Sequence, residues 1–115
     1  MYACKIFDTE NFNENDMQIV FKEVKIHGMI RSDFCVRHIQ TIKTSNKIYM
    51  IQEYANCFDL ACLMEQRGYL TQGEARIIMR QLVQGIRDVQ SLNIVHRDMK
   101  LANVLLHFPN MIQLD

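Results

Sequence analysis

The chain has 115 residues, the size of one small domain. Hydrophobic residues make up 49% of it and charged residues 23%, a balance that supports a buried core. The formal net charge is zero, so the composition gives no sign of a nucleic-acid partner or an anionic membrane surface. The apolar runs are too short to span a membrane, and the first residues lack the apolar stretch of a signal peptide.

The four cysteines form no C-x-x-C pair, so a zinc site is not expected. Without a secretion signal they are most simply reduced thiols, and we expect a cytoplasmic protein. The oligomeric state cannot be read from the sequence. The cysteines are Cys4, Cys35, Cys57 and Cys62.

The first half of the chain predicts one strand, one helix and then two strands. Residues 2–7 are rich in strand-forming side chains, and a polar loop follows at residues 8–15. Asp16 is predicted to cap a helix over about residues 17–30, because an acidic residue precedes apolar positions at helical spacing. Two further strands, residues 36–44 and 47–54, are predicted on either side of a short polar turn.

The second half predicts mainly helices. Asp59 begins a short helix that Gly68 ends, and the capping box from Thr71 to Glu74 opens a longer helix that reaches about Ser91. We expect the apolar stripe of this longer helix to be buried. A final hairpin is predicted from residues 104–107 and 111–114. The stripe consists of Ala75, Ile78, Met79, Leu82, Val83, Ile86 and Val89.

The segment from His96 to Asn103 reads H-R-D-x-K-x-x-N and carries an acid, a base and an amide at fixed spacing. The carboxylate of Asp98 can accept the proton of an attacking hydroxyl, and Lys100 can neutralise charge on a moving phosphoryl group. The amide oxygen of Asn103 can ligate magnesium. The competing interpretation is an ordinary polar loop between a helix and a strand.

This segment resembles the catalytic loop of eukaryotic protein kinases, and the similarity extends over nearly the whole chain. The resemblance implies an α+β, protein-kinase-like bilobal fold that is truncated at both ends. Residues 1–54 would form part of the small, β-rich N-lobe. Residues 55–115 would form the hinge and part of the helical C-lobe, including the catalytic loop and the hairpin after it.

The same resemblance assigns a nucleotide site to the first strand and helix. Tyr2-Ala3-Cys4-Lys5 is similar to the V-A-I-K strand of kinases, which makes Lys5 the candidate for the α- and β-phosphates of ATP. Glu23, eighteen residues later in the predicted helix, would be its carboxylate partner. Without the catalytic loop, a Lys and a Glu at this distance would read as solvated surface charges.

Residues 52–55 resemble the kinase hinge, with Gln52 at the gatekeeper position. The resemblance implies that the backbone groups of Glu53 and Ala55 read the adenine edge. Asp59 occupies a position where kinases often place a ribose-binding acid, and its competing role is the helix N-cap. Ala3, Leu60 and Leu105 would enclose the adenine ring, which is compatible with ordinary core packing.

By the resemblance, Asp98 is the catalytic base, Lys100 the phosphate partner and Asn103 a magnesium ligand, whereas His96 and Arg97 are structural. Lysine two residues after the aspartate is typical of the serine/threonine class, and the flanking residues are most similar to the Unc-51-like autophagy kinases. The predicted function is ATP- and Mg²⁺-dependent phosphoryl transfer to Ser or Thr of a protein substrate. The alternative is a non-catalytic pseudokinase or interaction module.

Several kinase features are absent from the 115 residues. The sequence contains no glycine-rich loop, no D-F-G and no A-P-E, so we expect this chain alone to be catalytically incompetent and to be a gene-model fragment or a region of a longer kinase. The later helices that would cover the far side of the helix with Ile78, Leu82 and Ile86 are missing too, so we expect an exposed apolar stripe there. Asp115 falls about one residue short of the D-F-G position and is not assigned as a metal ligand. His27 and His38 occupy positions that are usually apolar in kinases, which suggests altered regulation.

Overall fold

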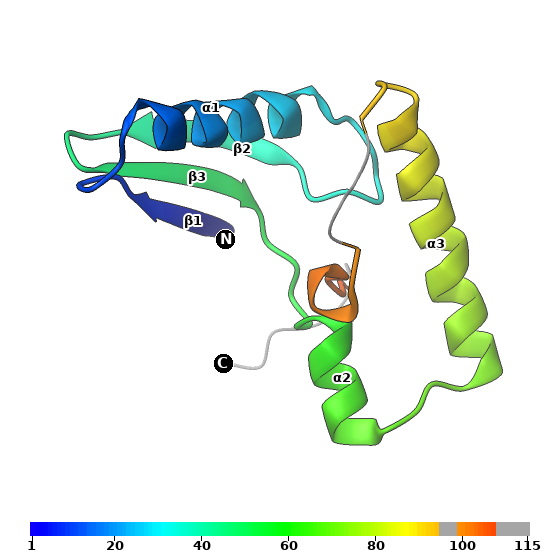
Figure 1. The fold of residues 1–115 in the computed structure, drawn as a ribbon. Helices are drawn as coiled ribbons and strands as arrows, with labels where there is room; N and C mark the ends of the chain where they lie inside the picture. Colours follow the sequence, from blue (N-terminus) through cyan, green and yellow to red (C-terminus); the bar gives the residue numbers. More distant parts are fainter. Residues whose placement is uncertain (95–98, 108–115) are drawn as a thin grey trace.

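The computed structural model describes residues 1–94 and 99–107, which form a three-stranded sheet with one helix, followed by a helical half (Figure 1). The predicted order of strands and helices is confirmed over these residues. The elements in chain order are β1 (Tyr2–Asp8), α1 (Glu14–Met29), β2 (His38–Lys43), β3 (Lys47–Glu53), α2 (Leu60–Arg67), α3 (Gln72–Gln90) and the 3₁₀ turn η1 (Leu101–Asn103).

The sheet is antiparallel with the order β1-β3-β2, so β3 lies in the middle. Because side chains alternate between the two faces of a strand, Ile48 and Met50 of β3 share one face. They are 0% and 1% exposed and form the centre of the small core. β1 pairs with β3 along its whole length, from Tyr2 opposite Glu53 to Asp8 opposite Lys47.

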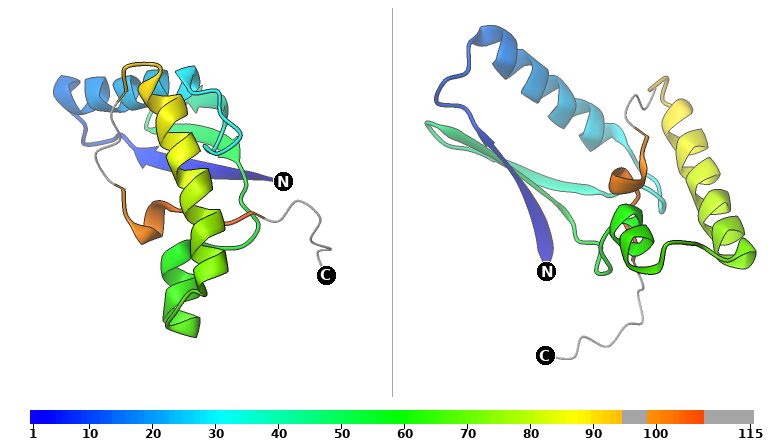
Figure 2. Two further views of the ribbon diagram at one scale, coloured as in Figure 1. Left: turned by 90° about the vertical axis from the view of Figure 1, so that its right-hand side faces the viewer. Right: turned by 60° about the horizontal axis from the view of Figure 1, so that its bottom comes forward.

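Helix α1 begins earlier than the sequence predicted, and Asp16 is not its cap. The N-cap is Asn13, whose side-chain oxygen accepts a hydrogen bond from the Asp16 amide at 2.9 Å. The Asp16 carboxylate in turn accepts one from the Asn13 amide at 3.2 Å. This reciprocal capping box satisfies two backbone donors at once, which favours a start at Glu14. The helix lies along β2 and buries Val20 (Figure 2).

The predicted ends of α2 and the start of α3 are confirmed. The Asp59 side chain accepts a hydrogen bond from the Cys62 amide at 2.8 Å and caps α2. Gly68 ends that helix with a left-handed φ of 78°, a conformation that favours glycine. Thr71 and Glu74 form the expected capping box at the start of α3. None of the helices in the described residues is long and apolar enough to span a bilayer.

The prediction that the whole apolar stripe of α3 is buried is wrong. Val89 is buried, but Met79 and Val83 are 55% and 44% exposed. The reason is that the loop after α1 lies only at the C-terminal end of α3 (Figure 1). There the Ser32 hydroxyl donates to the Asp88 carboxylate at 2.5 Å. The middle of the stripe therefore has little cover among the described residues.

The segment that follows η1 pairs with the chain just before α2. Leu105 and Asp59 form an isolated antiparallel bridge. The amide of Leu60 donates to the Val104 carbonyl at 2.8 Å, and the amide of Leu106 donates to the Phe58 carbonyl at 2.9 Å. The predicted hairpin partner, residues 111–114, lies outside the described residues. The observed partner of the first segment is thus a part of the chain far earlier in sequence.

Candidate functional site

Lys5 and Glu23 form an ion pair that joins β1 to α1. The Lys5 Nζ lies 2.6 Å from Oε1 of Glu23 and 5.0 Å from the centre of the Phe7 ring. The predicted contact is confirmed. The two side chains are 49% and 43% exposed, and an ion pair with this exposure adds little to stability. The pair is therefore better explained as a way of holding an amine in place than as a fold-stabilising contact.

The predicted hinge follows directly from β3. The Glu53 amide donates to the Arg37 carbonyl at 2.9 Å, and the Glu53 carboxylate accepts a hydrogen bond from the Arg37 amide at 3.0 Å. The Glu53 amide already donates to Arg37. A backbone hydrogen bond from Glu53 to a ligand would therefore use its carbonyl. Ala3 lies opposite Gln52 in the β1–β3 ladder, which brings the predicted adenine-contacting alanine next to the start of the hinge.

The bridge between Asp59 and Leu105 brings two predicted site residues together from segments 46 positions apart. Asp59 is the N-cap of α2, which was one of the two roles predicted for it. Leu105 is 45% exposed, whereas Leu60 is only 3% exposed. Leu60 is thus a core residue, and Leu105 offers apolar surface at the point where the two segments meet.

The thiol of Cys62 lies close to this bridge. The negative charge of Asp59, together with burial, raises the pKa of Cys62 above its ordinary value. A thiol with a raised pKa stays protonated at neutral pH and is a poor nucleophile. Cys62 is therefore expected to remain a neutral thiol at neutral pH.

The predicted catalytic loop is only partly described. Asp98, His96 and Arg97 lie outside the described residues, as does Asp115. Lys100 is the residue before η1, and its carbonyl accepts a hydrogen bond from the Asn103 amide at 2.9 Å. One tight turn therefore positions both described residues of the motif, and this turn packs beside α2.

The donor types of the loop suit magnesium. Mg²⁺ prefers oxygen ligands, and the amide oxygen of Asn103 is a ligand of this type. The described residues contain no cluster of three or more His, Cys, Asp or Glu that could hold a metal ion.

The protein kinase domain family matches residues 1–115. The chain belongs to this family. It is 31% identical over 104 residues to the serine/threonine-protein kinase SIK3 homolog of Danio rerio. The aligned region covers 90% of this chain and 9% of that protein. It is 28% identical over 105 residues to the serine/threonine-protein kinase 33 of Mus musculus, covering 91% of this chain and 21% of that protein.

The chain therefore spans roughly a tenth to a fifth of the length of these relatives. Its small antiparallel sheet and its helices are those of part of a bilobal kinase domain. Both relatives are named as serine/threonine-protein kinases. The predicted protein kinase family and truncated kinase fold are confirmed, whereas the serine/threonine class and the Unc-51-like subgroup stay predictions.

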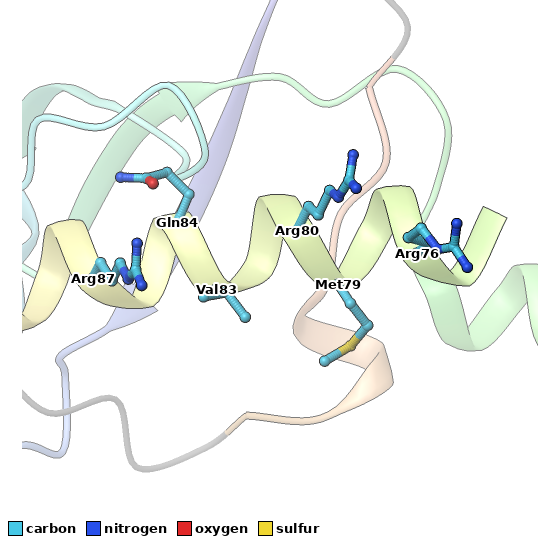
Figure 3. A pocket seen from close by; sticks show the side chains of 6 residues that line it. All are labelled: Arg76, Met79, Arg80, Val83, Gln84 and Arg87. Carbon is cyan, nitrogen blue, oxygen red and sulfur yellow. The ribbon is translucent and has the colours of Figure 1, made fainter. Parts of the chain in front are cut away.

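A hollow of about 400 Å³ lies elsewhere on the kinase chain, along α3 (Figure 3). It contains none of the predicted site residues, so it is not the candidate nucleotide site. It includes the exposed apolar side chains of the α3 stripe and three guanidinium groups. The lining residues are Arg76, Met79, Arg80, Val83, Gln84 and Arg87.

Sequence reasoning missed the residues that join the sheet to the helical half. Ser32 and Asp88 are 56 positions apart, and no short motif marks either of them. The sulfur of Cys35 lies 3.9 Å from the Gly85 carbonyl oxygen in the same contact. At Gly85 an added Cβ would lie 3.3 Å from Phe34, so the glycine allows the loop to approach α3. A small residue inside a strongly periodic helix was the only available signal.

Proposed function

We propose that the chain is the central part of a serine/threonine protein kinase that transfers the γ-phosphoryl group of ATP to Ser or Thr of a protein substrate. The observation that carries the proposal is the Lys5–Glu23 ion pair, formed in a chain that matches the protein kinase domain along its whole length. The serine/threonine-protein kinase names of its relatives support the choice of acceptor.

Lys5 would hold the α- and β-phosphates of ATP. A flexible ammonium group needs a fixed counter-charge to stay at one position, and Glu23 supplies it from α1 at 2.6 Å. The side chains of both residues are about half exposed, which leaves the amine accessible to a ligand. Both features support a binding role more strongly than a structural one.

The adenine ring would bind against the hinge. The Glu53 carbonyl and the backbone of Ala55 would read its edge, while Ala3 and Leu105 would cover its faces. The partial exposure of Leu105 and its bridge to Asp59 support this arrangement, because they put apolar surface and a carboxylate side by side. Asp59 would then reach the ribose while it caps α2.

Asp98 would accept the proton of the substrate hydroxyl, and Lys100 would stabilise charge on the transferred group. Asn103 would hold Mg²⁺, which when bound neutralises phosphate charge. The turn that ties Asn103 to Lys100 supports their acting at one place. The N-lobe would consist of residues 1–54, and the hinge and C-lobe of residues 55–115. We also propose that the protein is located in the cytoplasm.

The 115 residues contain neither a G-x-G-x-x-G loop nor a D-F-G motif. Phosphoryl transfer depends mainly on positioning and charge neutralisation, so loss of a phosphate-covering loop and of a metal ligand removes much of the catalysis. We therefore propose that these residues by themselves bind nucleotide without turning it over.

Binding of a fluorescent ATP analogue, with and without Mg²⁺, tests the proposal. Mg²⁺ should tighten binding to the chain, and Asn103→Ala should remove that effect. Asn15→Ala, a change on the exposed first turn of α1, is the matched control and should keep it. Absence of nucleotide binding would refute the proposed site. Transfer of labelled γ-phosphate that Asp98→Ala abolishes would instead refute the incompetence of the 115 residues.

A further inference from the structure

Two histidine rings form the contact between α1 and β2. The ring centres of His27 and His38 are 5.9 Å apart, and the ring planes are tilted by 55°. The His27 Nε2 lies 2.7 Å from the Val36 carbonyl oxygen. A carbonyl only accepts hydrogen bonds, so this nitrogen carries the hydrogen and donates it. The neutral form of His27 therefore has its proton on Nε2.

The ring of His38 lies directly against α1. Its Nε2 is 2.7 Å from the Thr41 hydroxyl of the same strand. Its Nδ1 faces the helix at Gly28, where an added Cβ would be 3.9 Å away. Because Nε2 is held by Thr41, protonation of both nitrogens would direct an N–H and a positive charge towards α1.

This contact bears on the position of Glu23. His27 follows Glu23 by four residues on α1, so the two side chains lie on the same face of the helix. Val20 is the only buried side chain of α1, in a helix that the structure describes completely. A helix held by so little buried surface depends on its remaining contacts, and the histidine pair is one of them.

The surroundings of His38 favour its neutral form. Burial lowers the pKa of His38, and the neighbouring His27 lowers that pKa further. The contacts from β2 and from the loop before it are the uncharged Thr41 hydroxyl and Val36 carbonyl. The acid one turn earlier on α1, Glu23, is bound by Lys5.

We propose that His27 and His38 are positioning residues that, as a neutral pair, hold α1 against β2 and thereby keep Glu23 at Lys5. Protonation of His38 in acid puts a positive charge at this contact, pushes α1 away from β2 and releases Glu23. The effect on nucleotide binding rests on the function proposed above, whereas the movement of α1 does not.

The sign of the pH dependence follows from the lowered pKa. The unfolded chain takes up the His38 proton near the ordinary histidine value of about 6.5, and the folded chain takes it up only at lower pH. The contribution of His38 is therefore complete above that value and is lost as the pH falls through the folded pKa.

Hydrogen exchange measured per residue from pH 7.5 to 5.5, corrected for intrinsic rates, tests the proposal without nucleotide. Protection of the second half of α1 should fall several-fold in acid, because burial disfavours the charged form of His38 at this contact, while protection of α3 stays constant. A double variant with His27→Leu and His38→Leu should lose this pH dependence. His107→Gln, a change at an exposed histidine, should keep it.

Constant protection of α1 in the wild-type chain, or pH dependence that survives in the double variant, would overturn the proposal. If the double variant does not fold, NMR titration of the histidine ring nitrogens in the wild-type chain provides the test instead. His38 should then titrate below the ordinary histidine value, and titration at or above that value would equally refute the pair. Acid release of α1 in a chain that binds no ATP analogue would support the proposal while refuting the nucleotide site.

Discussion

The Ser32 hydroxyl donates a hydrogen bond to Oδ2 of Asp88 across 56 residues of sequence. It joins the loop after α1 to the C-terminal end of α3, and so joins the half that carries Lys5 and Glu23 to the helical half. The other carboxylate oxygen of Asp88 accepts a hydrogen bond from Gln84 at 2.9 Å. One partly buried carboxylate thus connects the two halves.

Replacing Asp88 by Ala should lower the free energy of unfolding by about 1.5–3 kcal/mol, the usual range for a hydrogen bond to a charged group. The loss should be large because the partly buried Ser32 hydroxyl is left without its acceptor. Urea unfolding, monitored by circular dichroism, measures this change in the free energy of unfolding. Gln84→Ala removes only the exposed bond to the same carboxylate and should cost much less. Equal losses of unfolding free energy in Asp88→Ala and Gln84→Ala would contradict the idea that the bond from Ser32 connects the two halves.

Replacing Lys5 by Met should abolish binding of an ATP analogue and barely change stability. The ion pair with Glu23 is about half exposed, so its removal should cost less than about 1 kcal/mol of unfolding free energy. Fluorescence binding and urea unfolding of the same samples separate the two effects. Lys43→Met is the matched control, because Lys43 also lies over an aromatic ring, that of Phe21 at 5.2 Å. It should bind nucleotide normally.

The features that the sequence predicted correctly in the helical half are local ones. The cap at Asp59, the stop at Gly68 and the box from Thr71 to Glu74 each depend on residues within one turn of each other. The start of α1 was missed although it is equally local. Asn13 and Asp16 can both cap a helix, and their reciprocal bonds decide in favour of the earlier residue.

Long-range contacts were predicted only where the resemblance supplied them. The pair of Lys5 and Glu23 has no local signal, and it was expected because the catalytic-loop motif implied a kinase. The contact of Ser32 with Asp88 has neither a motif nor a local signal. Helical periodicity correctly placed Met79 and Val83 on one apolar face of α3. Periodicity defines a face but not what packs on it, so exposure on this helix was expected only from the resemblance, which implies covering helices that these 115 residues lack.

The ion pair of Arg67 with Glu74 should be visible in acid titration. Hydrogen bonds from Arg67, and then from Thr71, lower the pKa of Glu74 to about 2. A carboxylate whose folded pKa is lowered stabilises the fold above its unfolded pKa, and this contribution is lost as the pH falls through the folded pKa. NMR titration of the Glu74 side chain should therefore show a midpoint near 2. In Arg67→Met the midpoint should rise, and an unchanged midpoint would exclude Arg67 as the main cause.

Substitution of Gly68 and Gly73 by Ala should have opposite effects on stability. Gly68 ends α2 with a φ of 78°, and an added Cβ there would meet no atom within 4 Å. The cost of Gly68→Ala is thus backbone strain alone, about 1–2 kcal/mol. Gly73 lies in the first turn of α3 without a positive φ, and an added Cβ there is equally free of contacts. Gly73→Ala should stabilise the chain by about 0.4–1 kcal/mol, because alanine reduces the entropy of the unfolded chain. Urea unfolding of both variants measures the difference, and destabilisation by both would show that the space around the two glycines, rather than their backbone conformation, sets the outcome.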